Sequence, residues 1–272
     1  MISLKTPQEI DAIGRAGEIL ARLFDELRGR VVPGVTTERL DRIAEDFIRS
    51  HDRAEPAFKG LYGFPASLCT SVNEEVVHGI PSSRRTLAEG DIISIDAGVK
   101  LDGWYGDMAQ TLGVGEIDEE AERLLRVTGE ALAAGIEQAQ PGRRIGDIGH
   151  AVQSVAEAAG FTVVRELVGH GVGRGPHEEP QVPNFGRPGK GVQLKPGLVL
   201  AIEPMVNEGV AGVRTLADKW TVVTLDRRRS AHFEHTVAIT EAGPRILTAG
   251  EPAATPSPRG GVSAAGRGEV AS

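Results

Sequence analysis

Four carboxylates and one imidazole stand in this sequence where isolated polar groups are costly. They are Asp96, Asp107, His170, Glu203 and Glu234. The acids lie in or beside apolar stretches, and a buried carboxylate needs a partner. Four oxygen donors with one nitrogen suit Mn, Fe, Co or Zn better than Ca, and they lack the thiolates of a structural zinc site. The five residues therefore predict a site for divalent metal ions.

The chemistry that such a set would perform is hydrolysis. Two bridging carboxylates can hold two ions about 3.5–4 Å apart, the spacing found in two-metal hydrolases. Such a pair lowers the pKa of a shared water toward neutrality and stabilises the oxygens of a tetrahedral intermediate. We therefore expect a metal-dependent hydrolase that holds two ions.

The first two acids fall on a predicted hairpin. The segment 92–96 is short and rich in β-branched residues, which predicts a strand. The Asp102-Gly103 pair indicates a hairpin turn, after which residues 104–112 form the partner strand. Aspartate is a poor strand residue, and two acids on one inner face would repel each other. For Asp96 or Asp107 alone, an ordinary solvated loop acid is an equally good interpretation.

The other three candidates also have unusual neighbours. His170 lies in the glycine-dense segment 169–175, which we interpret as backbone approaching a ligand, although a lone histidine is usually structural. Glu203 ends a strand over 199–202 and precedes Pro204, which cannot continue a central ladder. Glu234 stands in the strand pattern 233–239.

Two helices are expected near the N-terminus. Thr6-Pro7-Gln8-Glu9 is a capping box with proline at the first helical position, and the apolar spacing predicts a helix over 7–28. A second amphipathic helix should start near Thr36 or Thr37 and place Leu40 and Phe47 on one face.

The pattern then repeats, which predicts a duplicated fold. Helical segments are expected near 118–138 and 145–159, and Pro33-Gly34 recurs as Pro141-Gly142, a spacing of 141 − 33 = 108 residues. The segment from Leu87 to Asp96 likewise recurs from Leu194 to Glu203. We expect an α+β fold of one catalytic domain over residues 1–249, with halves of about 1–115 and 116–249 related by a pseudo-twofold axis. Each half would deliver one carboxylate from the end of an equivalent strand into a central cleft.

Composition excludes several classes of protein. The net charge of −8 argues against nucleic acid as the main ligand, and no stretch is apolar enough to span a membrane. A single cysteine, Cys69, rules out an internal disulfide, and the N-terminus offers no signal peptide, so we expect a cytoplasmic protein. Residues 250–272 are of low complexity and are expected to be disordered.

These residues resemble the type I methionine aminopeptidases, whose duplicated architecture is called the pita-bread fold. The matching stretches are 71–81, 96–107, 169–185, 201–204 and 230–240, within a similarity that runs from about residue 1 to 249. The resemblance implies a central curved antiparallel sheet with helices outside. It also implies removal of the initiator methionine from nascent proteins whose second residue is small, with two divalent ions (Co, Mn, Fe or Zn).

The resemblance assigns a role to each candidate. It makes the five residues ligands, with Asp107 and Glu234 bridging, and Glu203 also shuttles the proton of the attacking water. His78 would lie near the scissile nitrogen or the substrate amine, and His177 would hydrogen-bond the scissile carbonyl. The alternative for either histidine is a structural loop residue whose ring nitrogens have ordinary hydrogen-bond partners.

An apolar pocket for the methionine side chain is also implied. Phe64, Cys69 and Trp220 match pocket positions, although ordinary core residues would look the same in sequence. Five residues depart from what the family would place there. Phe58, Leu61, Pro176, Gly98 and His232 stand where Cys, Tyr, Phe, Thr and Gln are expected. We expect these departures to alter the fine specificity rather than the reaction, because the ligand set is intact.

The substrates would be the N-termini of nascent polypeptides, met at the ribosome by a monomeric enzyme. An X-Pro aminopeptidase or prolidase shares the fold and the five ligands, but the run 173–185 and the short N-terminal region favour the methionine enzyme. A protein of this fold that has lost catalysis and serves as a binding module is a third reading. Such proteins typically lose ligands, and this sequence keeps all five.

Overall fold

A computed structural model describes residues 2–249 of the chain. The low-complexity segment 250–272, for which disorder was predicted, lies outside the described residues. Within residues 2–249, no helix is long and apolar enough to cross a membrane.

The helices begin and end close to where the sequence predicted them. They are α1 (Pro7–Arg28), α2 (Thr37–Arg49), α3 (Glu119–Glu137) and α4 (Ile145–Ala158), with a short 3-10 turn, η1 (Leu61–Gly63). The predicted capping box is present at α1, where the Thr6 hydroxyl accepts from the Glu9 amide at 3.3 Å and the Thr6 amide donates to the Glu9 carboxylate at 2.9 Å. These bonds satisfy two amides that the helix start leaves unpaired.

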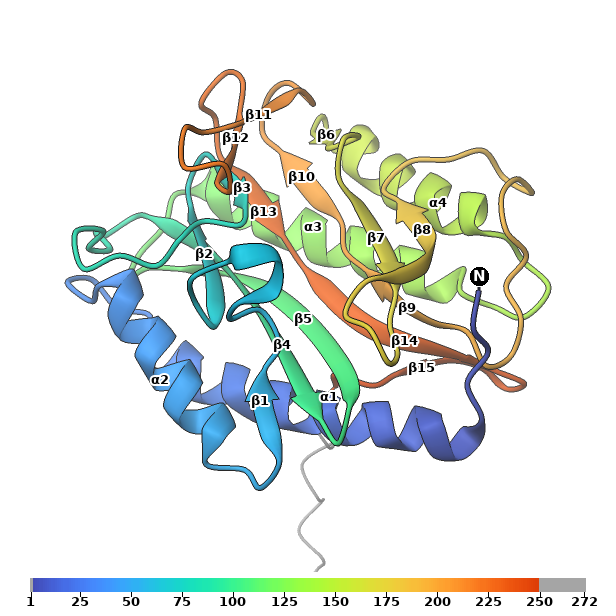
Figure 1. Ribbon diagram of the computed structural model, residues 1–272. Coiled ribbons are helices and arrows are strands. Elements are labelled where there is room, and N and C mark those ends of the chain that lie inside the picture. Colours follow the sequence, from blue (N-terminus) through green and yellow to red (C-terminus); the bar gives the residue numbers. More distant parts are fainter. Residues whose placement is uncertain (1, 250–272) are drawn as a thin grey trace, which may run out of the picture.

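A nine-stranded antiparallel sheet forms the centre of the molecule (Figure 1). Its main path runs β1-β4-β5-β14-β9-β7-β8, while β2 pairs with β4 and β15 pairs with β14. The strands are β1 (Ala54–Pro56), β2 (Leu68–Val72), β4 (Ile92–Leu101), β5 (Trp104–Gly113), β7 (Val168–Gly171), β8 (Glu178–Pro183), β9 (Val199–Ile202), β14 (Glu234–Thr240) and β15 (Gly243–Ile246).

Two three-stranded sheets border the main one. Their orders are β13-β10-β6 and β11-β12-β3. The strands are β3 (Glu75–Val77), β6 (Thr162–Val163), β10 (Met205–Asn207), β11 (Val213–Thr215), β12 (Val222–Thr224) and β13 (Ser230–His232).

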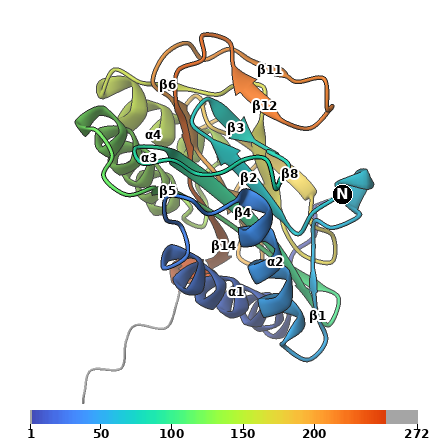
Figure 2. The ribbon, with the colours of Figure 1, turned by 90° about the vertical axis from the view of Figure 1, so that its left-hand side faces the viewer.

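The order of elements supports the predicted duplication. Two helices precede the main strands in each half, and β5 of the first half pairs with β14 of the second at the middle of the main sheet. The sheet curves, and the helices pack on its outer side (Figure 2). The predicted α+β architecture is confirmed, while the boundary of the halves near residue 115 stays a prediction.

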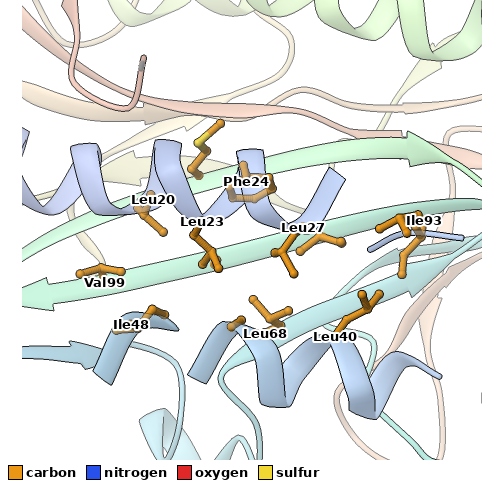
Figure 3. Close-up of a cluster of buried hydrophobic side chains, with 14 of the residues drawn as sticks. Leu20, Leu23, Phe24, Leu27, Leu40, Ile48, Leu68, Ile93 and Val99 are labelled. Carbon is orange, nitrogen blue, oxygen red and sulfur yellow. The ribbon is translucent and has the colours of Figure 1, made fainter. Parts of the chain in front are cut away.

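Strand alternation decides which side chains face the helices. On β4, Ile93, Ile95, Ala97 and Val99 pack into a core with α1 and α2, whose residues include Leu20, Leu23, Leu27, Leu40 and Ile48 (Figure 3). Successive strand side chains point to opposite faces, so the residues between them, Asp96 among them, face away from this core. The two faces of β4 thus separate the core from the candidate site.

The strand that carries Asp96 is longer than predicted. β4 continues to Leu101, so Asp96 lies inside the strand rather than at its end. Residues 97–101 pair fully with β5, up to Leu101 opposite Trp104. Glu203 does follow the end of β9, because Pro204 has no N–H for a ladder. The two carboxylates therefore lie at different places along their strands.

The glycines beside His170 have a packing role that the sequence interpretation missed. A Cβ at Gly169 would lie 2.3 Å from the Ala201 carbonyl oxygen, and one at Gly171 would lie 2.4 Å from the Glu179 carbonyl oxygen. These glycines let β7 approach its neighbours β9 and β8. Close strand packing accounts for these two glycines, and the approach of this backbone to a ligand stays a prediction.

We expect Gly171→Ala to lower the free energy of unfolding by roughly 1–3 kcal/mol, because the methyl group must push β7 from β8. Gly129→Ala is the matched control, since Gly129 lies in α3 and, apart from the neighbouring backbone of that helix, no atom of residues 2–249 lies within 4 Å of its Cβ position. The control should be neutral or stabilised by up to about 1 kcal/mol. Urea unfolding measures both, and equal stability of the two variants would contradict the packing explanation.

Candidate metal site

All the predicted site residues line one cavity of about 290 Å³. Its lining comes from both halves of the chain. It includes Asp96, Asp107, His170, Glu203 and Glu234 together with His78, His177, Phe64, Cys69 and Trp220. Three of the departures, Phe58, Leu61 and His232, line it as well.

Three of the acids share the inner face of the sheet. Asp96 on β4 lies opposite Ala109 on β5, and Asp107 on β5 lies opposite Gly98 on β4. Glu234 on β14 lies opposite the same Ala109. Residues directly opposite one another point to the same face, so the antiparallel register alone gathers these carboxylates.

The second half supplies the remaining two donors. His170 lies on β7, and Glu203 directly follows β9. The His170 Nε2 atom is 3.4 Å from Glu203 Oε1 and 3.9 Å from Asp107 Oδ2. The chain thus brings all five candidates together, although they span positions 96 to 234.

Three sets of donor atoms lie close enough to surround an ion. Within each set the atoms are within 4.8 Å of one another. The sets are Asp96 with Asp107 and Glu234, His170 with Glu203 and Glu234, and Asp107 with His170 and His177. Asp107, His170 and Glu234 each belong to two sets.

The backbone orients the His170 ring. Its Nδ1 atom lies 3.0 Å from the Gly171 carbonyl oxygen. A carbonyl oxygen can only accept, so Nδ1 carries the hydrogen and Nε2 presents its lone pair to the carboxylates. This is the arrangement in which a histidine coordinates a metal through Nε2.

Burial raises the pKa of all four acids. Desolvation, joined by Coulomb repulsion from Glu203, raises the pKa of Asp96 to about 7. Desolvation also raises the pKa of Glu203 to about 7, against the lowering effect of His170. The pKa values of Asp107 and Glu234 rise well above their usual range because burial is joined by repulsion between the acids. Without a cation, the protein must hold protons here.

The donor set fits a divalent cation. Asp96 Oδ1 and Glu234 Oε1 are buried without a hydrogen-bond partner among the described residues. Residues 2–249 contribute no lysine or arginine to the cavity lining that could neutralise the acids. Divalent metal ions coordinated by carboxylates and an imidazole would satisfy these oxygens and offset their repulsion.

Two more histidines face the cavity in neutral form. The His177 ring stands edge-on to His170 with ring centroids 4.5 Å apart, and it stacks with Tyr62 at 6.0 Å. The His78 ring lies 6.4 Å from Trp220. Desolvation lowers the pKa of both rings, that of His78 to about 4. Each can therefore accept or donate one hydrogen bond near neutral pH.

His232 adjoins the acids, although sequence reasoning gave it no role. It is 1% exposed, and its Nε2 atom lies 3.6 Å from Glu203 Oε2. Neither ring nitrogen has a hydrogen-bond partner within the described part of the chain. Its position two residues before Glu234 in the same apolar stretch was the available signal.

A buried ion pair anchors the loop that carries His177. The Lys5 ammonium donates to Glu178 Oε2 at 2.7 Å, and the Gly175 amide donates to Glu178 Oε1 at 3.0 Å. The Lys5 side chain is 3% exposed. The pair joins the N-terminal segment to the residue next to His177, and its sequence separation of 173 left no local signal.

One end of the cavity is apolar. Phe64, Ala66 and Cys69 form a buried cluster with Phe58, and Trp220 packs against it. The Phe64 and Trp220 rings are 5.1 Å apart and nearly perpendicular. Burial raises the pKa of the Cys69 thiol well above its usual value, with Asp96 and Asp107 adding to the effect, so the thiol is neutral. The cavity therefore places an apolar wall beside an acidic centre.

A curved antiparallel sheet that buries four carboxylates and one imidazole on its inner face defines a metal-dependent hydrolase. A sequence model of metallopeptidase family M24 matches residues 11–241. The chain belongs to this metallopeptidase family, and its architecture is the pita-bread fold.

Relatives cover the described chain almost completely. A methionine aminopeptidase of Clostridium perfringens is 57% identical over 248 residues, which are 91% of this chain and 99% of the relative. The crystal structure of methionine aminopeptidase from Thermotoga maritima is 48% identical with a TM-score of 0.90, over 92% of this chain and 100% of that one. A prolidase from Pyrococcus horikoshii shares the fold at 22% identity, with a TM-score of 0.74 over 92% of this chain and 64% of its own.

The metal-free protein should lose stability as pH rises. In the folded protein Asp96 and Glu203 have pKa values of about 7, above their values in the unfolded chain. At pH values between the unfolded and the folded pKa, the folded state therefore binds more protons than the unfolded state. The free energy of unfolding should therefore fall, by roughly 2 kcal/mol or more, from pH 5.5 to 7.5.

Thermal unfolding in the presence of a chelator, monitored by circular dichroism at several pH values from 5.5 to 7.5, measures this loss of stability. Divalent metal should reverse most of it at pH 7.5 and have less effect at pH 5.5, where protons compete for the carboxylates. A chelated protein equally stable at both pH values would show that the acids are neutralised in some other way.

Proposed function

We propose that this chain is a methionine aminopeptidase that removes the initiator methionine from nascent proteins whose second residue is small. The observation that carries the proposal is the full-length similarity to the Clostridium perfringens methionine aminopeptidase, at 57% identity. The acidic centre beside an apolar wall in one cavity supports it, because this arrangement suits a peptide N-terminus with an apolar first side chain.

Asp96, Asp107, His170, Glu203 and Glu234 are the proposed metal ligands. Asp107, Glu234 and His170 each belong to two donor sets, and of these only the two carboxylates have a pair of oxygens that could contact two ions, which supports a pair of ions that share Asp107 and Glu234. Two divalent ions bound there would supply Lewis-acid polarisation of the scissile carbonyl and a water of lowered pKa. The ligand set accepts Co, Mn, Fe or Zn, and availability selects among them.

Glu203 is the proposed proton shuttle. It stands between two imidazoles, with His170 Nε2 at 3.4 Å from one carboxylate oxygen and His232 Nε2 at 3.6 Å from the other. It would take a proton from the attacking water and deliver it to the leaving amine.

The two neutral histidines would position the peptide. His177 is proposed to donate a hydrogen bond to the scissile carbonyl as its oxygen gains charge. His78 is proposed to contact the scissile nitrogen or the free amine. Their lowered pKa values keep both rings uncharged near neutral pH, so neither repels a cation bound among the acids.

Phe64, Cys69 and Trp220 are the proposed pocket for the methionine side chain. All three line the cavity, and they offer it two aromatic rings and a neutral thiol. The substrates would be N-termini of nascent polypeptides, met in the cytoplasm at the ribosome by a monomeric enzyme.

We expect methionine to be released from Met-Ala-Ser when divalent metal is present, and much more slowly from Met-Lys-Ser, because the position beyond the scissile bond is cramped in this family. X-Pro peptides should not be cleaved. Amino-acid analysis of the products, with and without metal, measures all three. Preferential cleavage of X-Pro peptides would instead support the prolidase alternative.

Glu203→Gln should fold and retain metal but lose activity by roughly 10²- to 10⁴-fold, because the amide keeps one coordinating oxygen and cannot take a proton. Turnover of Met-Ala-Ser, with metal content measured on the same sample, tests this. Activity within a few-fold of the unmodified protein would make His78 or His177 the better candidate for the base.

A further inference from the structure

Two of the departures from the family pattern contact each other. Gly98 lies on β4 directly opposite Asp107, on the face of the sheet that carries the acids. A Cβ added at Gly98 would lie 2.7 Å from Phe58 Cε1 and 2.8 Å from Ala57 Cβ. Real Cβ atoms do not approach other carbon atoms so closely. The Phe58 ring, together with the Ala57 methyl group, therefore occupies the space that a side chain at position 98 would need.

The backbone holds the ring in this place. β1 pairs with β4 through Pro56 and Val99, and the Ala57 amide donates to the Gly98 carbonyl oxygen at 2.9 Å. The Leu61 amide donates to the Phe58 carbonyl oxygen, also at 2.9 Å. These bonds fix the backbone on both sides of Phe58, so a substituent at position 98 could be accommodated only by straining this turn or moving the ring.

The ring also borders both ends of the cavity. Phe58 is 7% exposed, packs with Phe64 and Cys69 at the apolar end, and lines the cavity that holds Asp107. Its other side faces Gly98, next to the acidic end. A large, rigid ring in this position limits how far an apolar side chain can extend along the wall.

We propose that Phe58, seated against Gly98, sets the size of the pocket for the first side chain of the substrate. Gly98 is the complementary half of the pair, because it alone leaves room for the ring. This inference rests on the proposed function in that the pocket is taken to receive the N-terminal residue. The steric coupling between the two positions does not depend on any activity.

A double-mutant cycle tests the coupling. Gly98→Ala should lower the melting temperature by at least roughly 3 °C, since its methyl group displaces the ring or Ala57. In a Phe58→Ala background the same change should cost clearly less, because the ring is gone and the Ala57 Cβ atom, 2.8 Å from the added methyl group, is the close contact that remains. Equal costs in the two backgrounds, measured by thermal unfolding of metal-loaded protein, would overturn the steric pairing.

Specificity is read from the peptides Met-Ala-Ser, Leu-Ala-Ser and Phe-Ala-Ser. Phe58→Ala should raise KM for Met-Ala-Ser and shift the ratio of kcat/KM values toward the bulkier first residues by about 10-fold or more. Phe161→Ala is the matched control, since Phe161 is a buried ring in a different cluster, outside the cavity lining. It should lower stability and leave the ratio unchanged.

The outcomes separate this inference from the proposed function. If the unmodified protein fails to release methionine, the proposed function is wrong, and the melting temperatures still judge the steric pair. If the unmodified protein releases methionine while Phe58→Ala changes the ratio of kcat/KM values between the peptides by less than twofold, Phe58 does not select the first side chain of the substrate.

Discussion

Repulsion between buried carboxylates is the constraint on which this structure depends. Asp107 and Glu234 are each 5% exposed or less, and they face Asp96 and Glu203 in one cavity. Four acids in a low-dielectric site cannot all be ionised without a cation. The protein therefore has to hold protons or metal here, and the rest of the fold keeps the acids from moving apart.

The register of strand pairing in the main sheet holds the acids in place. Hydrogen bonding between β4 and β5 and between β5 and β14 sets three of the acids on one face, while α1 and α2 bury the other face. Thr236 strengthens the central junction, because its hydroxyl donates to the Asp107 carbonyl oxygen at 2.7 Å and accepts from the Asp107 amide at 3.0 Å. Moving one acid would thus require breaking the pairing that joins the two halves of the chain.

Groups outside the acidic centre adapt it for a peptide. Lys5 fixes the loop that carries His177 through its bond to Glu178, and Phe58 with Gly98 shapes the apolar end. These contacts join segments that are distant in sequence.

The sequence by itself determined the helices, the main hairpin and the choice of the five candidate ligands. Those features have local causes, such as the capping box at Thr6, the Asp102-Gly103 turn and the cost of an acid in an apolar stretch. Only the tertiary structure decided that β4 runs past Asp96 and that the glycines around His170 pack strands. It alone revealed that Phe58 fills the space of Gly98. These three features depend on contacts between segments that are distant in the sequence, and no local pattern of residues encodes such contacts.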